Sequence, residues 1–259
     1  MTKTILITGA TDGIGRLTAE KLAAAGHHVL LHGRSTAKLE TAAREIGGRV
    51  ATYAADLSDL AQTAALAEAI RADHGTLDVV INNAGVLKAP ETRTAEGLDL
   101  RFVVNTLAPY LLTRRLLPII PQTGRIVNLS SAAQAPVEIA AMMGETRLDD
   151  MAAYAQSKLA LTIWTRALAE TLPGGPLVVA VNPGSLLASK MVMEGFGVAG
   201  SDLSIGADIL IEASLGARFA GMSGRYFDND AGAFAAPHRA ADNPEHRKAV
   251  MQAIKTLIA

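Results

Sequence analysis

The stretch Thr4-Ile-Leu-Ile-Thr-Gly-Ala-Thr-Asp-Gly-Ile-Gly15, with the pattern that continues from it to Ala25, decides the fold of this chain. The aliphatic run from Ile5 to Ile7 is typical of a strand that is buried on both faces. After Ile14 the apolar residues follow the spacing of an amphipathic helix. The sequence therefore predicts a strand, a tight turn and a helix.

The predicted turn contains three glycines, Gly9, Gly13 and Gly15. A residue without a Cβ atom allows a positive φ and the close approach of a ligand. The helix that follows directs unpaired N–H groups and the positive end of its dipole at the same place. These features favour an anion site, best suited to a pyrophosphate, over the alternative that the glycines serve packing alone.

Composition narrows the class of protein. The 259 residues carry 24 Lys and Arg against 25 Asp and Glu, and no basic block is interleaved with aromatic residues, so we expect no nucleic-acid surface. The apolar runs are short and the first strand begins at once, so we expect neither a membrane span nor a signal peptide. The chain lacks cysteine and its six histidines are scattered, which argues against disulfides and a metal site. We expect one cytoplasmic domain over residues 1–259.

Strand and helix patterns alternate along the chain, which is typical of a parallel sheet built from βαβ units. Polar motifs follow the strands, and open parallel sheets bind ligands at the carboxyl ends of their strands. Strands are expected at residues 4–7, 29–32, 49–53, 77–82, 125–129, 177–181 and 225–227; helices are expected after the caps Ser35 and Ser58, at 94–117, 149–172 and 205–219, and as a closing helix capped by Asn243, with a loop through residue 201.

Tyr154 and Lys158 form the clearest chemical pair. Residues four apart lie on one face of a helix, so the phenol and the ammonium project together. A free tyrosine has a pKa of about 10, and a neighbouring cation lowers this pKa toward the range useful for proton transfer. The alternative is a boundary tyrosine beside a solvated lysine.

Two further polar positions accompany the pair. The hydroxyl of Ser131, just past a strand, can donate to a substrate carbonyl oxygen, although Ser130 and Ser131 can also satisfy local backbone groups. Asn105 lies in an apolar helical stretch, where a buried amide must find partners. It is therefore either a structural bridge or a functional group.

Six motifs occur together along the chain. They are Thr8-Gly-Ala-Thr-Asp-Gly-Ile-Gly15, Asn82-Asn-Ala-Gly85, Asn105, Ile126-Val-Asn-Leu-Ser-Ser131, Tyr154 with Lys158, and Pro183-Gly184. In order and position, these motifs resemble those of the classical short-chain dehydrogenases/reductases. The resemblance implies a Rossmann-type α/β fold, a doubly wound, mostly parallel sheet of seven strands with helices on both faces, which binds a nicotinamide dinucleotide.

The resemblance also implies roles for individual residues. Tyr154 moves the proton of the substrate oxygen, Ser131 rather than Ser130 holds that oxygen, Lys158 bonds the nicotinamide ribose, and Asn105 helps to hold a relay water. The implied catalytic set is Asn105, Ser131, Tyr154 and Lys158, and the implied cofactor set is Gly9, Thr11, Asp12, Gly13, Ile14, Gly15, Arg34, Asp56, Leu57, Asn83, Ala84, Gly85, Tyr154, Lys158, Pro183, Gly184 and Leu186.

Arg34 follows the second strand, where relatives that prefer NAD carry an acidic residue. A guanidinium there can grip a 2′-phosphate, so we predict NADP(H), with NAD(H) as the alternative. Asp12 opposes this preference, because its charge repels a phosphate, and Arg16 is the candidate to offset it. A second departure is Ala188, where the family usually has a nicotinamide-binding Thr; Ser189 comes next.

The spacing of 23 positions from Ser131 to Tyr154, together with Gly224-Arg-Tyr-Phe227, makes the chain look like the retinol-dehydrogenase-like branch. The insert at about 132–151 and the loop at about 186–203 contain methionines, which suit an adaptable apolar pocket as well as a core. We therefore predict hydride transfer between NADP(H) and a small carbonyl or a primary or secondary alcohol, the substrate being apolar. The helices at 94–117 and 149–172 match those through which relatives form dimers and tetramers, which implies a homodimer or homotetramer.

Two other functions are compatible with the same motifs. A catalytically weak, dinucleotide-binding regulatory protein of this fold would fit the departures at Asp12 and Ala188. A nucleotide-sugar epimerase or dehydratase would use the same Tyr154 and Lys158 chemistry, but only about 75 residues follow Pro183-Gly184, which is short for its substrate region.

Overall fold

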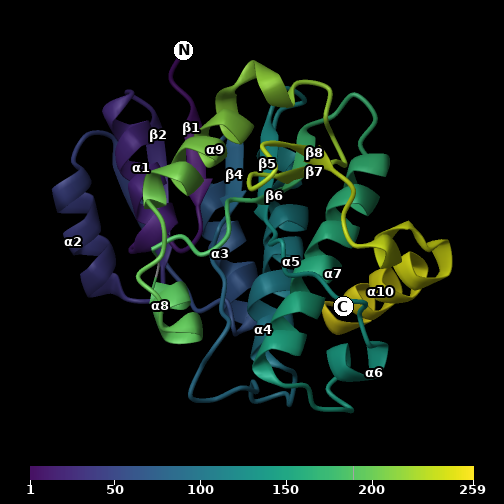
Figure 1. Cartoon of the computed structure of the whole chain (residues 1–259). Helices are drawn as coiled ribbons and strands as arrows, with labels where there is room; N and C mark the ends of the chain where they lie inside the picture. The colour runs from purple at the N-terminus through teal and green to yellow at the C-terminus, as the bar shows by residue number, and fades with distance from the viewer. Residues whose placement is uncertain (189) are drawn as a thin grey trace.

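The computed structural model describes residues 1–188 and 190–259, except for the side chains of Lys190, Glu194 and Phe196. All strands belong to one sheet with the order β3-β2-β1-β4-β5-β6-β7-β8, and helices cover both of its faces (Figure 1). The first seven strands are parallel and β8 pairs with β7 in the antiparallel direction. The strands are β1 Thr4–Ile7, β2 His28–Gly33, β3 Val50–Ala54, β4 Val79–Asn82, β5 Arg125–Leu129, β6 Leu177–Asn182, β7 Tyr226–Asp228 and β8 Ala233–Ala235.

The connections are mostly helical, as parallel strands require. The α-helices are α1 Gly13–Ala24, α2 Thr36–Ile46, α3 Leu60–Asp73, α4 Leu100–Phe102, α5 Ala108–Leu116, α6 Ile139–Met142, α7 Asp150–Glu170, α8 Lys190–Phe196, α9 Leu203–Leu215 and α10 Pro244–Leu257. A π-helix joins α4 to α5 at Val103–Leu107, and 3₁₀ turns lie at Leu117–Ile119, Ala217–Phe219 and Arg239–Asp242.

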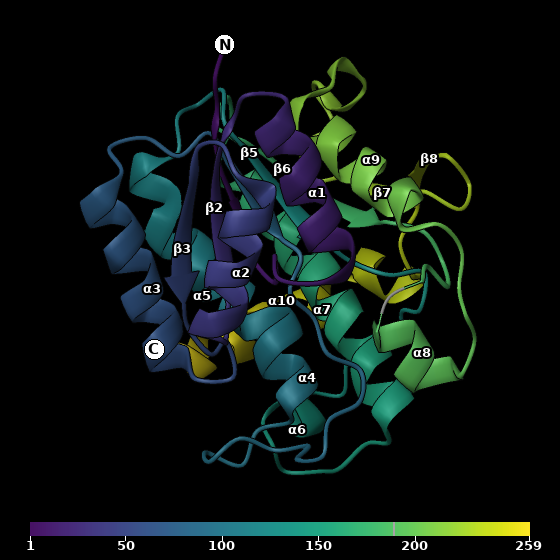
Figure 2. The same ribbon diagram turned by 90° about the vertical axis from the view of Figure 1, so that its left-hand side faces the viewer.

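Two apolar cores lie on opposite faces of the sheet, because successive strand side chains point to opposite sides. Leu6 packs into the core under α3, α5 and α7, together with the fully buried Trp164. Ile5 and Ile7 pack into the other core, under α1, α2 and α9. The turned view in Figure 2 shows α1 and α2 in front of the strands and α7 and α10 behind them. The prediction of a doubly wound α/β sheet is confirmed.

The sheet contains one strand more than the sequence predicts, the short strand β8. The sequence predicts seven strands and a strand ending at Phe227, but β7 continues to Asp228 and the chain turns back into β8. Phe227 and Phe234 are cross-strand partners in this hairpin. A three-residue strand lacks enough alternation to be visible in the sequence, and its pairing depends on the aromatic residues packed beside it.

Several element ends also differ from expectation. The helix expected at 94–117 begins only at Leu100, because the carboxylate of Asp99 accepts the backbone N–H of Arg101 and caps it there. Asp59 rather than Ser58 caps α3, since it accepts from two backbone N–H groups of the first turn. The expected loop before residue 201 contains α8, and α9 ends at Leu215 rather than 219.

Candidate active site

Most of the predicted site residues lie where strands end, whereas Asn105, Tyr154 and Lys158 lie on helices. Residues 9–15 follow β1, Arg34 follows β2, Asp56 and Leu57 follow β3, and residues 83–85 follow β4. Ser131 comes after β5 and residues 183–186 come after β6. Because these strands are parallel and adjacent, their carboxyl ends share one edge of the sheet. The fold thus brings the predicted residues together from six separate segments.

The glycine turn is held against the end of β4. The side chain of Asn83 donates to the carbonyl oxygens of Thr8 at 2.8 Å and Gly9 at 3.1 Å, and the Thr8 hydroxyl accepts the backbone N–H of Asn83 at 3.0 Å. Gly9 has φ +66°. A Cβ atom on Gly15 would lie 2.5 Å from the carbonyl oxygen of Gly9 and would collide with the amide of Asn83. Only glycine fits at position 15.

His32 supports the same turn from the end of β2, and the sequence motifs do not reveal it. Its Nδ1 accepts the backbone N–H of Gly9 at 3.4 Å and its Nε2 donates to the carbonyl oxygen of Ala55 at 3.1 Å. This pair of contacts requires a neutral ring. Burial lowers the pKa of His32 to about 4, so the ring is neutral at pH 7. A histidine inside a buried strand is the sequence signal that marks it.

The charged residues near this end have different environments. Arg34 is exposed, and its guanidinium has no partner within the described part of the chain. Arg16, in contrast, forms ion pairs with Glu20 at 2.7 Å and Glu45 at 3.0 Å. It is therefore not free to offset Asp12, whose carboxylate accepts the backbone N–H of Gly13 at 2.7 Å and caps α1.

Helix α7 presents the Tyr154 and Lys158 pair. Asp149 caps the helix by accepting the backbone N–H of Ala152 at 2.8 Å. The Lys158 ammonium is buried, donates to the carbonyl oxygen of Leu129 at 2.7 Å, and lies 5.6 Å from the centroid of the Tyr154 ring. The two side chains therefore face the end of β5 together, as the four-residue spacing predicts.

The electrostatics of this pair differ from the expectation that Lys158 lowers the pKa of Tyr154. Burial raises the pKa of Tyr154 above its ordinary value, and the hydrogen bond from Ser131 only partly opposes this rise. Burial also lowers the pKa of Lys158 to about 8. The reason is that a poorly solvated site disfavours the charged form of both groups. The Tyr154 phenol is thus protonated at neutral pH.

The two serines after β5 have separate tasks. Ser130 is buried, and its hydroxyl shares a 2.7 Å hydrogen bond with Thr162 inside α7. Ser131 is half-buried, and its hydroxyl accepts the backbone N–H of Ala133 at 3.1 Å. Its carbonyl oxygen accepts from Gln134 at 2.9 Å and from Tyr226 at 3.1 Å. The Ser131 hydroxyl is also near enough to the Tyr154 phenol to lower the pKa of that phenol.

Asn105 lies in the π-helix, and its amide is fully engaged. Its oxygen accepts the backbone N–H of Val86 at 2.8 Å, and its nitrogen donates to the Val86 carbonyl at 2.9 Å and to Ser157 at 3.0 Å. Asn105 therefore bridges α7 and the segment after β4. The sequence leaves two roles open for Asn105, a structural bridge or a functional group. These contacts show that it is a structural bridge. A π-turn often marks a functional position, and the relay role implied by the family resemblance stays a prediction.

The segment after β6 is the least regular part of the site. Gly184 has φ +127°, and Leu186, at φ +51°, is the one non-glycine residue with positive φ among residues 1–188 and 190–259. Ala188 donates its backbone N–H to the carbonyl oxygen of Ser201 at 2.7 Å. Ser189, the suggested substitute for the family's threonine, lies outside the described residues.

The residues present fit a dinucleotide. The glycine turn is a cradle that a Cβ atom would fill, it opens onto the N-terminus of α1, and the ends of β2 to β4 continue the same edge. Gly85 lies near Lys158, because a Cβ atom on it would be 3.4 Å from the Lys158 ammonium. Within the described residues no group of three His, Cys, Asp or Glu side chains is placed to hold a metal ion.

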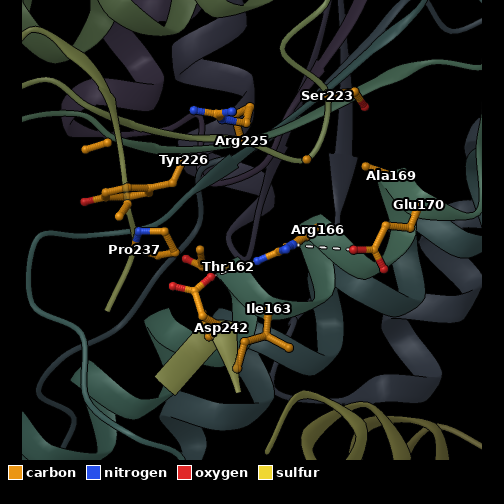
Figure 3. A pocket seen from close by; sticks show the side chains of 14 residues that line it. Thr162, Ile163, Arg166, Ala169, Glu170, Ser223, Arg225, Tyr226, Pro237 and Asp242 are labelled. Atoms are coloured by element: carbon orange, nitrogen blue, oxygen red, sulfur yellow. Dashed lines mark hydrogen bonds and ion pairs between the residues drawn. The ribbon is translucent and has the colours of Figure 1, made fainter. Parts of the chain in front are cut away.

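A separate cavity of about 460 Å³ lies beside the second half of α7, and it contains none of the predicted site residues. Figure 3 shows Arg166 at its centre, directed toward Glu170 and Asp242, with the ring of Tyr226 forming another wall. The ion pairs measure 3.4 Å to Glu170 and 3.0 Å to Asp242. The predicted chemistry is therefore at the strand ends, not in this cavity.

Comparison with known proteins supplies independent evidence. The model of the family described as short chain dehydrogenase matches residues 3–196. Retinol dehydrogenase 12 of Mus musculus is 35% identical over 245 residues, which cover 88% of this chain and 78% of that protein. An uncharacterised protein from Mycobacterium paratuberculosis superposes with TM-score 0.81 at 29% identity, covering 99% of this chain and 93% of that one. A short chain dehydrogenase from Escherichia coli CFT073 complexed with NADPH superposes with TM-score 0.71 at 27% identity, covering 88% and 96%.

Proposed function

We propose, from the premise that this chain belongs to the short chain dehydrogenase family of NAD(P)-dependent oxidoreductases, that it transfers a hydride between NADP(H) and an apolar carbonyl compound or alcohol. The observation that carries the proposal is the cluster of Ser131, Tyr154 and Lys158 beside the glycine turn. The Ser131 hydroxyl is near enough to the Tyr154 phenol to lower its pKa, and the Lys158 ammonium lies over the same ring, 5.6 Å from its centroid.

In this mechanism the nicotinamide supplies or accepts the hydride when the cofactor is bound. Ser131 donates a hydrogen bond to the substrate oxygen and holds it beside the phenol. For reduction, Tyr154 gives its proton to that oxygen as the negative charge develops. The raised pKa of Tyr154 supports this direction, because burial keeps the proton on the phenol until it is needed.

Lys158 and Asn105 act around the proton donor. Lys158, with a pKa lowered to about 8, carries a positive charge below this pH and can stabilise the phenolate that proton transfer leaves behind. Asn105 fixes the distance between α7 and the segment after β4 through its bonds to Val86 and Ser157. The residues of the predicted cofactor set that line the strand ends would hold the dinucleotide.

The preference for NADP(H) is supported by the charges after β2. Arg34 is exposed, its guanidinium has no partner among the residues that the structure describes, and no acidic residue follows the end of β2 beside it. Such a group can bind a 2′-phosphate through two hydrogen bonds. The similar Escherichia coli protein is named as an NADPH complex. Asp12 is the opposing charge, and its use as a helix cap leaves it less free to repel a phosphate.

An apolar substrate is supported by the exposed side chains near α8. Met193 is 56% exposed, and Leu186, Val198 and Ile205 in the same part of the chain are also exposed. Met151, at the start of α7, is exposed as well. Met142 is fully buried in the core, so the insert methionines do not all line a pocket. The relatives named retinol dehydrogenases fit an apolar alcohol or aldehyde.

The cellular location and the oligomeric state of the protein are part of the same proposal. In the described part of the chain, none of the helices combines the length and apolar character that crossing a bilayer demands. We propose a cytoplasmic homodimer or homotetramer that packs through α5 and α7, in line with the family resemblance. Light scattering on the purified protein tests the assembly, and a monomer at micromolar concentration would contradict it.

Replacing Tyr154 by Phe tests the mechanism. We expect turnover of an apolar aldehyde with NADPH to fall by about 10²- to 10⁴-fold, because the proton donor is lost, while NADPH affinity stays within about twofold. Tyr53→Phe is the matched control, since the Tyr53 hydroxyl bonds Asp73 and His74 away from the cleft. Undiminished turnover in Tyr154→Phe would overturn the mechanism, and a preference for polar aldehydes would overturn the substrate class.

A further inference from the structure

The β7–β8 hairpin, residues 226–235, forms a rigid support at the edge of the sheet. The rings of Phe219, Phe227 and Phe234 pack with centroid distances of 5.0 to 5.1 Å. The Arg218 guanidinium lies 4.6 Å from the centre of the Phe227 ring and donates to the carbonyl oxygen of Gly232 in the turn. Packed aromatic side chains have few alternative rotamers, so the turn of this hairpin is held in one place.

The turn of the hairpin bonds the segment that leaves β6. Asp230 accepts the backbone N–H of Ser185 at 2.8 Å through Oδ1. Its Oδ2 accepts the Ser185 hydroxyl at 2.5 Å and the Asn182 amide at 2.9 Å. Asn229 donates to the carbonyl oxygen of Pro183 at 2.9 Å. One carboxylate thus accepts three hydrogen bonds from two residues, Asn182 at the end of β6 and Ser185 in the segment after it.

The residue that follows Ser185, the partner of Asp230, has a strained backbone conformation. Leu186, next to Ser185, has φ +51°, which a leucine adopts only when its surroundings impose it. Leu186 then accepts the backbone N–H of Ser201 at 2.7 Å, and Ala188 donates to Ser201 at 2.7 Å. These two bonds hold together the two ends of residues 188–201, the segment that contains α8; we call this pair of ends the base of the segment. The position of that base therefore depends on how Ser185 is held.

We propose that Asp230 is a positioning residue that fixes the backbone of residues 183–186 against the nicotinamide half of the cofactor. This inference rests on the proposed function, because it needs the dinucleotide to lie along the strand ends. The adenosine half would lie at the ends of β1 to β4, and among the described residues no hydrogen bond or ion pair joins the turn that contains Asp230 to those strand ends. Loss of the carboxylate therefore weakens one half of the cofactor site and leaves the other intact.

The test compares a whole cofactor with a fragment that has no nicotinamide. We expect Asp230→Ala to weaken NADPH binding about tenfold or more, while the affinity for 2′,5′-ADP stays within about twofold. Ser185→Ala, which removes one of the three donors, should change NADPH affinity in the same direction by a smaller factor. Asp242→Asn is the matched control, because this exposed acid pairs with Arg166 outside the cleft.

Limited proteolysis gives a second readout, since residues 186–201 should be cut faster in Asp230→Ala than in the wild type. Equal losses of NADPH and 2′,5′-ADP affinity, or no loss of either in both Asp230→Ala and Ser185→Ala, would overturn the positioning role. If Asp230→Ala does not fold, the Ser185→Ala result alone decides. Failure of the wild-type protein to bind 2′,5′-ADP would instead overturn the proposed function, and the two failures are therefore distinguishable.

Discussion

At the β1 end of the cleft the sheet holds the site through its own neighbouring strands, whereas at the β6 end the chain is held by a hairpin from much later in the sequence. The glycine turn bonds Asn83 and His32, which belong to the adjacent strands β4 and β2. The segment after β6 bonds Asp230, 45 residues further on from Ser185. Leu186, Met193 and Val198 at the β6 end are exposed, although Leu187 is buried, and Gly15 at the β1 end is buried. The β1 end of the site is thus part of the core of the sheet, whereas the β6 end lies outside the core and depends on the β7–β8 hairpin.

Gly15→Ala should have the largest effect, because it breaks the end that belongs to the core. The new Cβ atom would lie 2.5 Å from the carbonyl oxygen of Gly9 and would displace the Asn83 amide. We expect a loss of about 1 to 3 kcal/mol in the free energy of unfolding and a loss of about 100-fold in NADPH affinity. Urea unfolding and fluorescence titration measure the two quantities.

Gly75→Ala is the matched control for this prediction. Gly75 has ordinary φ and a Cβ atom on it would meet nothing within 4 Å. It should leave both the stability and the NADPH affinity unchanged. A Gly15→Ala protein that binds NADPH as tightly as the control would show that the turn is not the pyrophosphate site.

His32 should make the β1 end sensitive to acid. The pKa of His32 is lowered from 6.5 to about 4 in the folded chain, so below pH 6.5 the unfolded chain binds a proton that the folded chain does not. The stability is complete above pH 6.5 and is lost as the pH falls through 4, with a difference of about 2 kcal/mol already at pH 5. His32→Gln should remove this part of the pH dependence. Urea unfolding at pH 7 and at pH 5 measures the loss in the free energy of unfolding for the wild type and for His32→Gln. An equal loss in both proteins would contradict the prediction.

Arg34→Ala tests the cofactor preference at the same end. We expect NADPH to bind about tenfold more weakly, a difference of about 1.4 kcal/mol, while NADH affinity stays the same, because only NADPH carries the 2′-phosphate. Arg49→Ala, an exposed arginine at the start of β3, is the control. A wild-type preference for NADH would mean that Asp12 decides the preference instead.

The contrast between the two ends also explains what the sequence predicts. Strand, glycine turn and helix are local patterns, and so is the Tyr154 and Lys158 spacing, which is why the sheet and the face of α7 could be predicted. Asp230 and His32 bond residues 45 and 23 positions away. The place of His32 in a buried strand singles out that histidine, but no local pattern identifies the partner of either residue. Helix α8 has only seven residues, and a Cβ atom on its Gly195 would lie 2.7 Å from Leu87, so its formation depends on tertiary packing.

Gly200→Ala should have the smallest effect, because it disturbs only the β6 end of the site, which lies outside the core. Gly200 has φ +77°, and a Cβ atom on it would lie 2.7 Å from the backbone of Ala188, which forces open the base of residues 188–201. Since φ is positive at both Gly200 and Gly197, each alanine carries a similar backbone strain, and the free energy of unfolding should fall by about 1 kcal/mol or less in both variants. Only in Gly200→Ala should NADPH dissociate about fourfold faster, which corresponds to less than about 1 kcal/mol. Gly197→Ala is the matched control, because Gly197 also has positive φ, at +67°, but open space around it. Stopped-flow displacement measures the dissociation rate. If Gly200→Ala lowered global stability as much as Gly15→Ala, the two ends would not be independent, and the β6 end would have to be counted as part of the core.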